Sequence, residues 1–360
     1  MQPHSALLVP DIVHDVFRYF DLDHWQHAAF ERDRSRTENA RLRALAASAR
    51  VCTVFRDAAL PVLWGSLCNV TPLVRLLSSC IKEPLKTAAN AKGSTTGPYV
   101  FRIEASEIPS HEKERLTYYG SLVRKVDTNA VAFRYCERGS NVYSHSINPS
   151  SWTYLQVLVG DLPAVLLPNL QCYTVDFGHP SELAFLRLGA SPSLLRVDLH
   201  HRGVAGVHPD LREEWQSIID QLLSDVIPIA TRLESFKLKC RGLQLTFRMA
   251  ASIARAPRLR FLELLFFFSS DVAAGTNPLW HAFPLLCPLK ELEKLVLYHD
   301  LSTESPSPLS VNTPSGLILP QLRELELFGT QNVLHLRSFL QLVQSTTLQR
   351  IDLKGLVYSN

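Results

Sequence analysis

Residues 259–264 read Leu-Arg-Phe-Leu-Glu-Leu, and residues 322–327 read Leu-Arg-Glu-Leu-Glu-Leu. Both have the pattern apolar-x-x-apolar-x-apolar, and its last three residues alternate with the period of two that is typical of a β-strand. The pattern recurs through the second half of the chain. The predicted copies are Trp152/Leu155/Val157, Leu170/Tyr173/Val175, Leu194/Val197/Leu199, Leu233/Phe236/Leu238, Leu259/Leu262/Leu264, Leu292/Leu295/Leu297, Leu322/Leu325/Leu327 and Leu348/Ile351/Leu353.

Amphipathic stretches lie between these strand-like segments, which indicates a repeat of strand and helix. Successive copies start 18 to 39 residues apart, whereas leucine-rich repeats typically span about 20 to 29 residues. The longer spacings imply insertions, and the pattern resembles irregular leucine-rich repeats. We therefore predict an α/β solenoid over residues 110–360, with parallel strands alternating with helices. The predicted helices are Ser181–Leu188, Asp210–Ile227, Gln244–Arg255 and Leu336–Gln344.

The main competing fold is a doubly wound α/β domain with a nucleotide or another ligand at the strand ends. Such a domain is expected to have a glycine-rich turn after its first strand. The sequence contains neither Gly-x-Gly-x-x-Gly nor Gly-Lys-Ser/Thr, which favours the solenoid.

Strand periodicity also predicts a binding face on the solenoid. Side chains between the repeat leucines point away from the core. An apolar centre with a charged rim is typical of a binding hot spot. We predict target binding on this concave face; the alternative is that a loop or the C-terminus covers it. The predicted target-binding residues are Lys237, Lys239, Glu263, Leu265, Val296, Tyr298, Glu326 and Phe328.

The N-terminal residues 1–82 have helical rather than strand periodicity. Residues 9–20 have one apolar stripe, with Pro10 in the first turn. A polar insertion follows at about residues 23–41. We predict further short helices over residues 42–55, 57–64 and 71–81, and no strand. Residues 83–109, which are rich in small and polar side chains at 85–98, are predicted to be a linker.

Three segments of this region together resemble an F-box of the type common in fungal proteins. They read Val9-Pro10-x-Ile12-x3-Val16-Phe17-x2-Phe20, then Ala49-x-Val51-Cys52-x2-Phe55-Arg56, then Leu60-x2-Leu63-Trp64. Val9 stands where the family usually has leucine, and the polar insertion is longer than in many members. The resemblance implies docking on a Skp-type adaptor and, through it, on a cullin–RING ubiquitin ligase. The adaptor-binding residues that it implies are Pro10, Ile12, Val13, Val16, Phe17, Val51, Cys52 and Phe55.

The resemblance leads us to expect that Val9, Ile12, Val13 and Phe17 are exposed in the isolated chain. Trp64 is expected to pack inside the module or against the next domain. The alternative is a helical cap whose apolar stripe faces the protein's own core. In that case the chain is a repeat scaffold that never joins a ligase.

Composition places the chain among ordinary soluble proteins, with 46% hydrophobic and 20% charged residues and a formal net charge of +3. Its basic residues are interspersed with acidic ones, so no nucleic-acid partner is predicted. No apolar run approaches the roughly 18 residues of a membrane helix, and no signal peptide is recognisable. The seven cysteines form no Cys-x-x-Cys pair. We therefore predict an intracellular protein, cytoplasmic or nuclear, with reduced thiols and no membrane partner.

No catalytic or metal-binding motif is recognisable. There is no Gly-x-Ser-x-Gly elbow, and His111-Glu112 lacks the second histidine of a zinc-protease helix. His200 and His201 are adjacent, so on a strand they point to opposite faces. The sequence thus predicts a non-enzymatic protein without a cofactor, in which the N-terminal helices bind an adaptor and the solenoid binds a protein target whose identity the sequence does not give.

Overall fold

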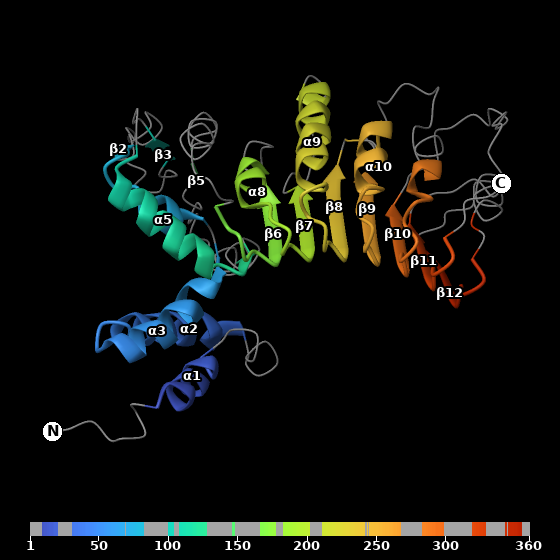
Figure 1. Ribbon diagram of the computed structural model, residues 1–360. Helices are drawn as coiled ribbons and strands as arrows, with labels where there is room; N and C mark the ends of the chain where they lie inside the picture. The colour runs from blue at the N-terminus through green and yellow to red at the C-terminus, as the bar shows by residue number, and fades with distance from the viewer. Residues whose placement is uncertain are drawn as a thin grey trace. The chain divides into compact units, whose positions relative to one another are not determined.

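The computed structural model describes residues 9–20, 31–68, 70–82, 100–103, 108–127, 146–147, 166–177, 183–201, 211–241, 243, 245–267, 283–298, 319–328, 343 and 345–354 (Figure 1). The chain divides into two compact units, Met1–Leu170 and Gln171–Asn360. Both contain helices and strands, so the protein is α/β in class.

The second unit is built on parallel strands that lie side by side in chain order (Figure 1). They are β6 (Cys172–Phe177), β7 (Arg196–His201), β8 (Ser235–Arg241), β9 (Phe261–Phe267), β10 (Lys294–Tyr298), β11 (Glu324–Phe328) and β12 (Arg350–Lys354). Each predicted apolar-x-x-apolar-x-apolar segment from Leu170 onward ends in one of these strands. The copy at Trp152/Leu155/Val157 lies outside the described residues.

The backbone repeats as regularly as the sequence pattern. The carbonyl oxygen of Glu234, just before β8, accepts hydrogen bonds from the backbone N–H groups of Arg260 and Phe261 at 2.9 and 3.0 Å. The carbonyl of Arg260 accepts the equivalent pair from the next repeat. The same pair of bonds recurs at the carbonyls of Gln171, Leu195, Glu293 and Arg323. This recurrence fixes the register, so equivalent residues of adjacent repeats stand next to one another.

The repeat leucines form the core of this unit. Phe236, Leu238, Leu262 and Leu264 are fully buried, as are their equivalents in β6, β7, β10 and β11. Strand β12 differs, because its core-facing residues Ile351 and Leu353 are 45% and 36% exposed.

Helices lie along one side of the strands in Figure 1. They are α8 (Ala184–Gly189), α9 (Arg212–Val226) and α10 (Phe247–Ile253), and a 3₁₀ turn η6 (Phe283–Leu286) follows β9. Three predicted helices are thus confirmed; α10 starts late because Thr246 caps it, its side-chain oxygen accepting the N–H of Met249 at 3.0 Å. The helix predicted at 336–344 lies outside the described residues. This alternation is compatible with an α/β solenoid.

The first unit combines helices with short strands. The helices are α1 (Pro10–Arg18), α2 (Glu31–Ser48), α3 (Thr53–Gly65), α4 (Thr71–Val74) and α5 (Ser110–Leu122). The strands are β1 (Ser66–Leu67), β2 (Ile81–Lys82), β3 (Val100–Ile103), β4 (Lys125–Asp127) and β5 (Ser146–Ile147). Strands β1 and β4 pair in parallel, whereas β2 and β3 pair in antiparallel orientation.

Several predictions for this unit are wrong. Helix α2 starts at Glu31, inside the predicted polar insertion, and ends at Ser48, and the backbone at Cys52, just before α3, is extended. Helix α3 therefore joins the end of one predicted helix to the whole of the next and runs through Pro61. The helix predicted over residues 71–81 ends at Val74, and β1 and β2 lie in a region predicted to have no strand.

Candidate binding surfaces

Helix α1 has a buried apolar side. Val13 and Phe17 are 2% and 6% exposed and pack in a small core with Leu45 of α2 and Ala58 and Ala59 of α3. The Phe17 ring meets Phe55 of α3 edge to face, with ring centroids 5.7 Å apart. This core holds the three helices together.

Next to this buried side, α1 has further apolar residues that face solvent. Ile12 and Val16 are 45% and 52% exposed, and Val9 and Tyr19 are exposed as well. These residues are spaced three or four positions apart and so share one helical face. We call Val9, Ile12, Val16 and Tyr19 the α1 stripe. A cluster of exposed apolar side chains is typical of an interaction surface.

The structure separates the predicted adaptor-binding residues into two groups. Pro10, Ile12, Val16, Val51 and Cys52 are exposed, the last two at the junction of α2 and α3. The expectation that Val13 and Phe17 are exposed is wrong, because these positions, four apart, face α3; Phe55 is half-buried against them. Sequence reasoning missed Tyr19, which continues the spacing of the α1 stripe.

Two contacts tie the helices of the first unit to α5. The Trp64 ring of α3 packs against that of Tyr119 of α5 in a tilted arrangement, with centroids 4.5 Å apart. The buried Glu112 carboxylate accepts hydrogen bonds from the Ser78 hydroxyl at 2.9 Å and from the Ser79 N–H and hydroxyl at 2.9 and 2.7 Å. Burial raises the pKa of Glu112, but these bonds outweigh it and lower the pKa overall. Glu112 is thus an ionised structural anchor.

The second surface is the outer strand face, which consists of the side chains of β6 to β12 that alternate with the buried ones. At its centre Glu263 of β9 is held by two lysines of β8. The Nζ atoms of Lys237 and Lys239 lie 3.5 and 2.9 Å from its carboxylate oxygens.

A second glutamate, two strands further on, is also held by two lysines, one from each adjacent strand. Glu326 of β11 lies between Lys294 of β10, which contacts it directly, and Lys354 of β12 at 3.4 Å. Lys294 also contacts Glu324 at 2.9 Å. Hydrogen bonds from Lys294 outweigh burial and lower the pKa of Glu326, while its bonds to Glu326 and Glu324 raise the pKa of Lys294. These charges therefore satisfy one another within the sheet.

Aromatic rings lie among these charged groups. The Nζ atoms of Lys237 and Lys294 lie 5.0 and 5.9 Å from the centre of the Phe261 ring, and Lys354 lies 5.1 Å from that of Phe328. An ammonium group over a ring face is favourable because the ring carries negative charge on its face.

The structure brings the predicted target-binding residues together. Lys237, Glu263, Val296 and Glu326 pair in register across four strands, and Lys239, Leu265, Tyr298 and Phe328 do so in the adjacent row. However, Glu263, Val296 and Glu326 are almost buried by their neighbours, so they offer little surface. Phe261 and Lys294 are outward-facing contributors that sequence reasoning missed. The sequence could have identified both, because each stands two positions before a predicted residue of the same strand and therefore points to the same face.

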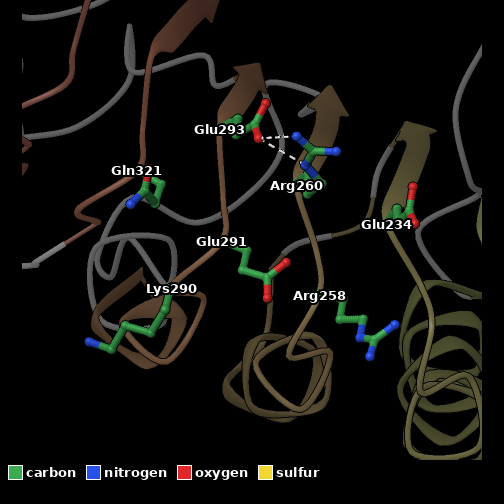
Figure 2. A pocket seen from close by; sticks show the side chains of 7 residues that line it. All are labelled: Glu234, Arg258, Arg260, Lys290, Glu291, Glu293 and Gln321. Atoms are coloured by element: carbon green, nitrogen blue, oxygen red, sulfur yellow. Dashed lines mark hydrogen bonds and ion pairs between the residues drawn. The ribbon is translucent and has the colours of Figure 1, made fainter.

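A groove runs along the turns that lead into β8–β11 (Figure 2). It is lined by Glu234, Arg258, Arg260, Lys290, Glu291, Glu293 and Gln321. Arg260 and Glu293 form an ion pair across it, which raises the pKa of Arg260. A lining with both charge signs and no apolar residue is unlike the apolar pockets in which small molecules bind. The groove is therefore a poor candidate for an active site.

Other chemistry-bearing groups have structural surroundings. Burial raises the pKa of Cys240 to about 12, so its thiol stays protonated. His200 lies 3.4 Å from Asp176 on the outer strand face. Within the described ranges, no group of three or more His, Cys, Asp or Glu side chains is placed to hold a metal ion. In the same part of the chain, no helix has the length and hydrophobicity needed to cross a membrane.

No protein-family model matches this sequence, and no curated protein is significantly similar to it. Its function must therefore be argued from the two surfaces described above.

Proposed function

We propose that this chain is a non-catalytic substrate-recognition subunit of a Skp–cullin–F-box ubiquitin ligase. The observation that carries the proposal is the α1 stripe, an exposed apolar helix face held in place by its own small core. It lies in the segment whose sequence resembles an F-box. The adaptor contacts are Val9, Pro10, Ile12, Val16 and Tyr19, with Val51 and Cys52 at the nearby helix junction.

Apolar burial would drive such docking. Burying a fully exposed apolar side chain contributes about 1.5 to 3 kcal/mol before the costs of association, and Ile12 and Val16, which are 45% and 52% exposed, would each contribute roughly half of that. Val13 and Phe17 contribute indirectly, because their packing fixes the orientation of α1 against α3.

The mechanism requires no chemistry from this chain. The helices hold the adaptor, the outer strand face holds a protein target, and tethering raises the concentration of that target near the ligase. This function implies an intracellular location, cytoplasmic or nuclear.

The test is the double substitution Ile12→Asp/Val16→Asp in the full chain. We expect it to abolish co-purification with a Skp-type adaptor while the circular dichroism spectrum and the melting temperature are retained. The matched control is Leu211→Asp/Ile229→Asp, two apolar residues that flank α9 and have similar exposure. Retained adaptor binding in a folded Ile12→Asp/Val16→Asp variant overturns the proposal.

A repeat scaffold independent of any ligase is the second candidate. The burial of Val13 and Phe17 in the module's own core favours it, because two implied adaptor contacts serve the fold instead. Truncation near Tyr99 does not separate the two candidates, since it removes β1, the partner of β4, and the serines that hold Glu112. Direct measurement of adaptor binding does separate them.

A further inference from the structure

The charges on the outer strand face are not evenly distributed. Its centre, β8 to β10, has three lysines, Lys237, Lys239 and Lys294, and one carboxylate, Glu263. On either side carboxylates are in excess. Strands β6 and β7 have Asp176, Asp198 and Arg196, and strands β11 and β12 have Glu324, Glu326, Asp352, Arg350 and Lys354. Among the described residues, a positive centre thus lies between two negative ends.

The central lysines retain capacity for another anion. An ammonium group has three hydrogen-bond donors. Lys237 and Lys239 each contact the carboxylate of Glu263, on opposite oxygens. Glu263 is almost buried, so a second anion approaches the lysines from the solvent side without competing for its position.

Apolar surface adjoins these donors. The half-buried Phe261 ring lies between the ammonium groups of Lys237 and Lys294, and the half-buried Leu265 pairs in register with Lys239. A ligand that places an anionic group on the lysines therefore sets a neighbouring side chain against Phe261 or Leu265.

Resting on the proposed function, we propose that the centre of the outer strand face binds a target segment in which an anionic side chain stands next to an aromatic or aliphatic one. Lys237, Lys239 and Lys294 bind the anion, and Phe261 and Leu265 contact the apolar neighbour. Carboxylate and phosphate share this chemistry. The negative ends of the face repel segments with acidic residues along their whole length, and this favours a short acidic motif.

The probe is a fluorescein-labelled peptide of alternating Gly and Ser with a central Glu-Phe-Glu, measured by fluorescence anisotropy with the full chain, purified alone or with its adaptor. Two matched peptides have Lys-Phe-Lys or Glu-Ala-Glu in place of Glu-Phe-Glu. A third has phosphoserine in place of the first Glu. We expect the Glu-Phe-Glu or phosphoserine peptide to bind, the Lys-Phe-Lys and Glu-Ala-Glu peptides to bind at least about tenfold more weakly, and binding to weaken with salt. The stronger of the two anionic peptides identifies the source of the anion.

Two pairs of variants locate the site. Glu263→Gln removes a negative charge close to the bound anion and is expected to tighten binding about fivefold, whereas Asp352→Asn, the same charge change on β12, leaves it within about twofold. Lys237→Gln is expected to weaken binding about fivefold, while Lys354→Gln does not. Each of these lysines lies over an aromatic ring and shares its glutamate with a second lysine, so the glutamate stays paired.

Equal binding of the Glu-Phe-Glu and Lys-Phe-Lys peptides, or equal responses in both members of each pair of variants, overturns the inference. Because Ile12→Asp/Val16→Asp leaves the outer strand face intact, it is expected to bind the peptide normally. Failure of adaptor docking and failure of this site are therefore distinguishable.

Discussion

The two surfaces of this protein differ in how far each is satisfied within the chain. In the α1 stripe Val9, Ile12 and Val16 are exposed, although Val13 and Phe17 of the same helix are well packed. The outer strand face is rich in charge, but its glutamates are paired with lysines of adjacent strands. An exposed apolar cluster is typical of a surface that binds by burial, whereas a self-paired charged surface is typical of one whose charges select the ligand.

The largest expected effect on the free energy of unfolding comes from substituting a buried residue of α1, in comparison with an exposed residue of the same helix. Phe17→Ala removes a buried aromatic side chain and is expected to destabilise the chain by about 3 kcal/mol. Val16→Ala, one residue away on the exposed side, is expected to change stability by less than about 0.5 kcal/mol. Urea unfolding followed by circular dichroism measures both, and equal losses would mean that the two sides are not different.

A smaller effect is expected at the buried carboxylate of the first unit. Glu112→Gln loses charge-assisted hydrogen bonds with Ser78 and Ser79 and is expected to cost about 2 kcal/mol at neutral pH. The pKa of Glu112 is lower in the folded state, so its contribution is complete above the ordinary glutamate pKa and is lost as the pH falls through the folded value. The difference in unfolding free energy between wild type and variant should therefore shrink in acid. A difference independent of pH would contradict the ionised state of Glu112.

The corresponding polar contact in the second unit joins α9 to α10. The Thr246 hydroxyl donates to the carboxylate of Asp220 at 2.8 Å and caps α10. Burial raises the pKa of Asp220, and loss of this donor is expected to raise the pKa further. Thr246→Ala is expected to lower the free energy of unfolding by about 1 kcal/mol, whereas Thr246→Ser, which keeps the hydroxyl, is expected to retain most of the wild-type stability. Thermal unfolding of the three proteins tests this order, and no recovery in the serine variant would exclude the hydroxyl as the cause.

Prediction from sequence succeeded where one periodicity repeats. The apolar-x-x-apolar-x-apolar segments located β6 to β12, because each repeat buries its leucines against the next, and the register then placed Lys237, Glu263 and Glu326 in one row. It failed at α2 and α3, where the backbone is extended at Cys52 although the helical spacing of apolar residues continues through Cys52 to Phe55. It also failed to separate Ile12 from Val13, because both belong to one broad apolar stripe and helical spacing does not show which part of that stripe is buried.

The smallest effect is expected in the groove of Figure 2. Arg260 is exposed and its partner Glu293 lies at the surface, so Arg260→Ala is expected to leave the melting temperature unchanged within error. It should also leave adaptor binding and peptide binding unchanged. A large loss of adaptor binding or of peptide binding would mean that the groove, and not only the two proposed surfaces, takes part in binding.

The most direct test of the central claim is co-expression of the full chain with a Skp-type adaptor, followed by size-exclusion chromatography. The account predicts a one-to-one complex and a chain that is poorly soluble alone, because the α1 stripe is covered only by the adaptor. A soluble monomer that elutes apart from the adaptor would contradict the account and identify the chain as a repeat scaffold.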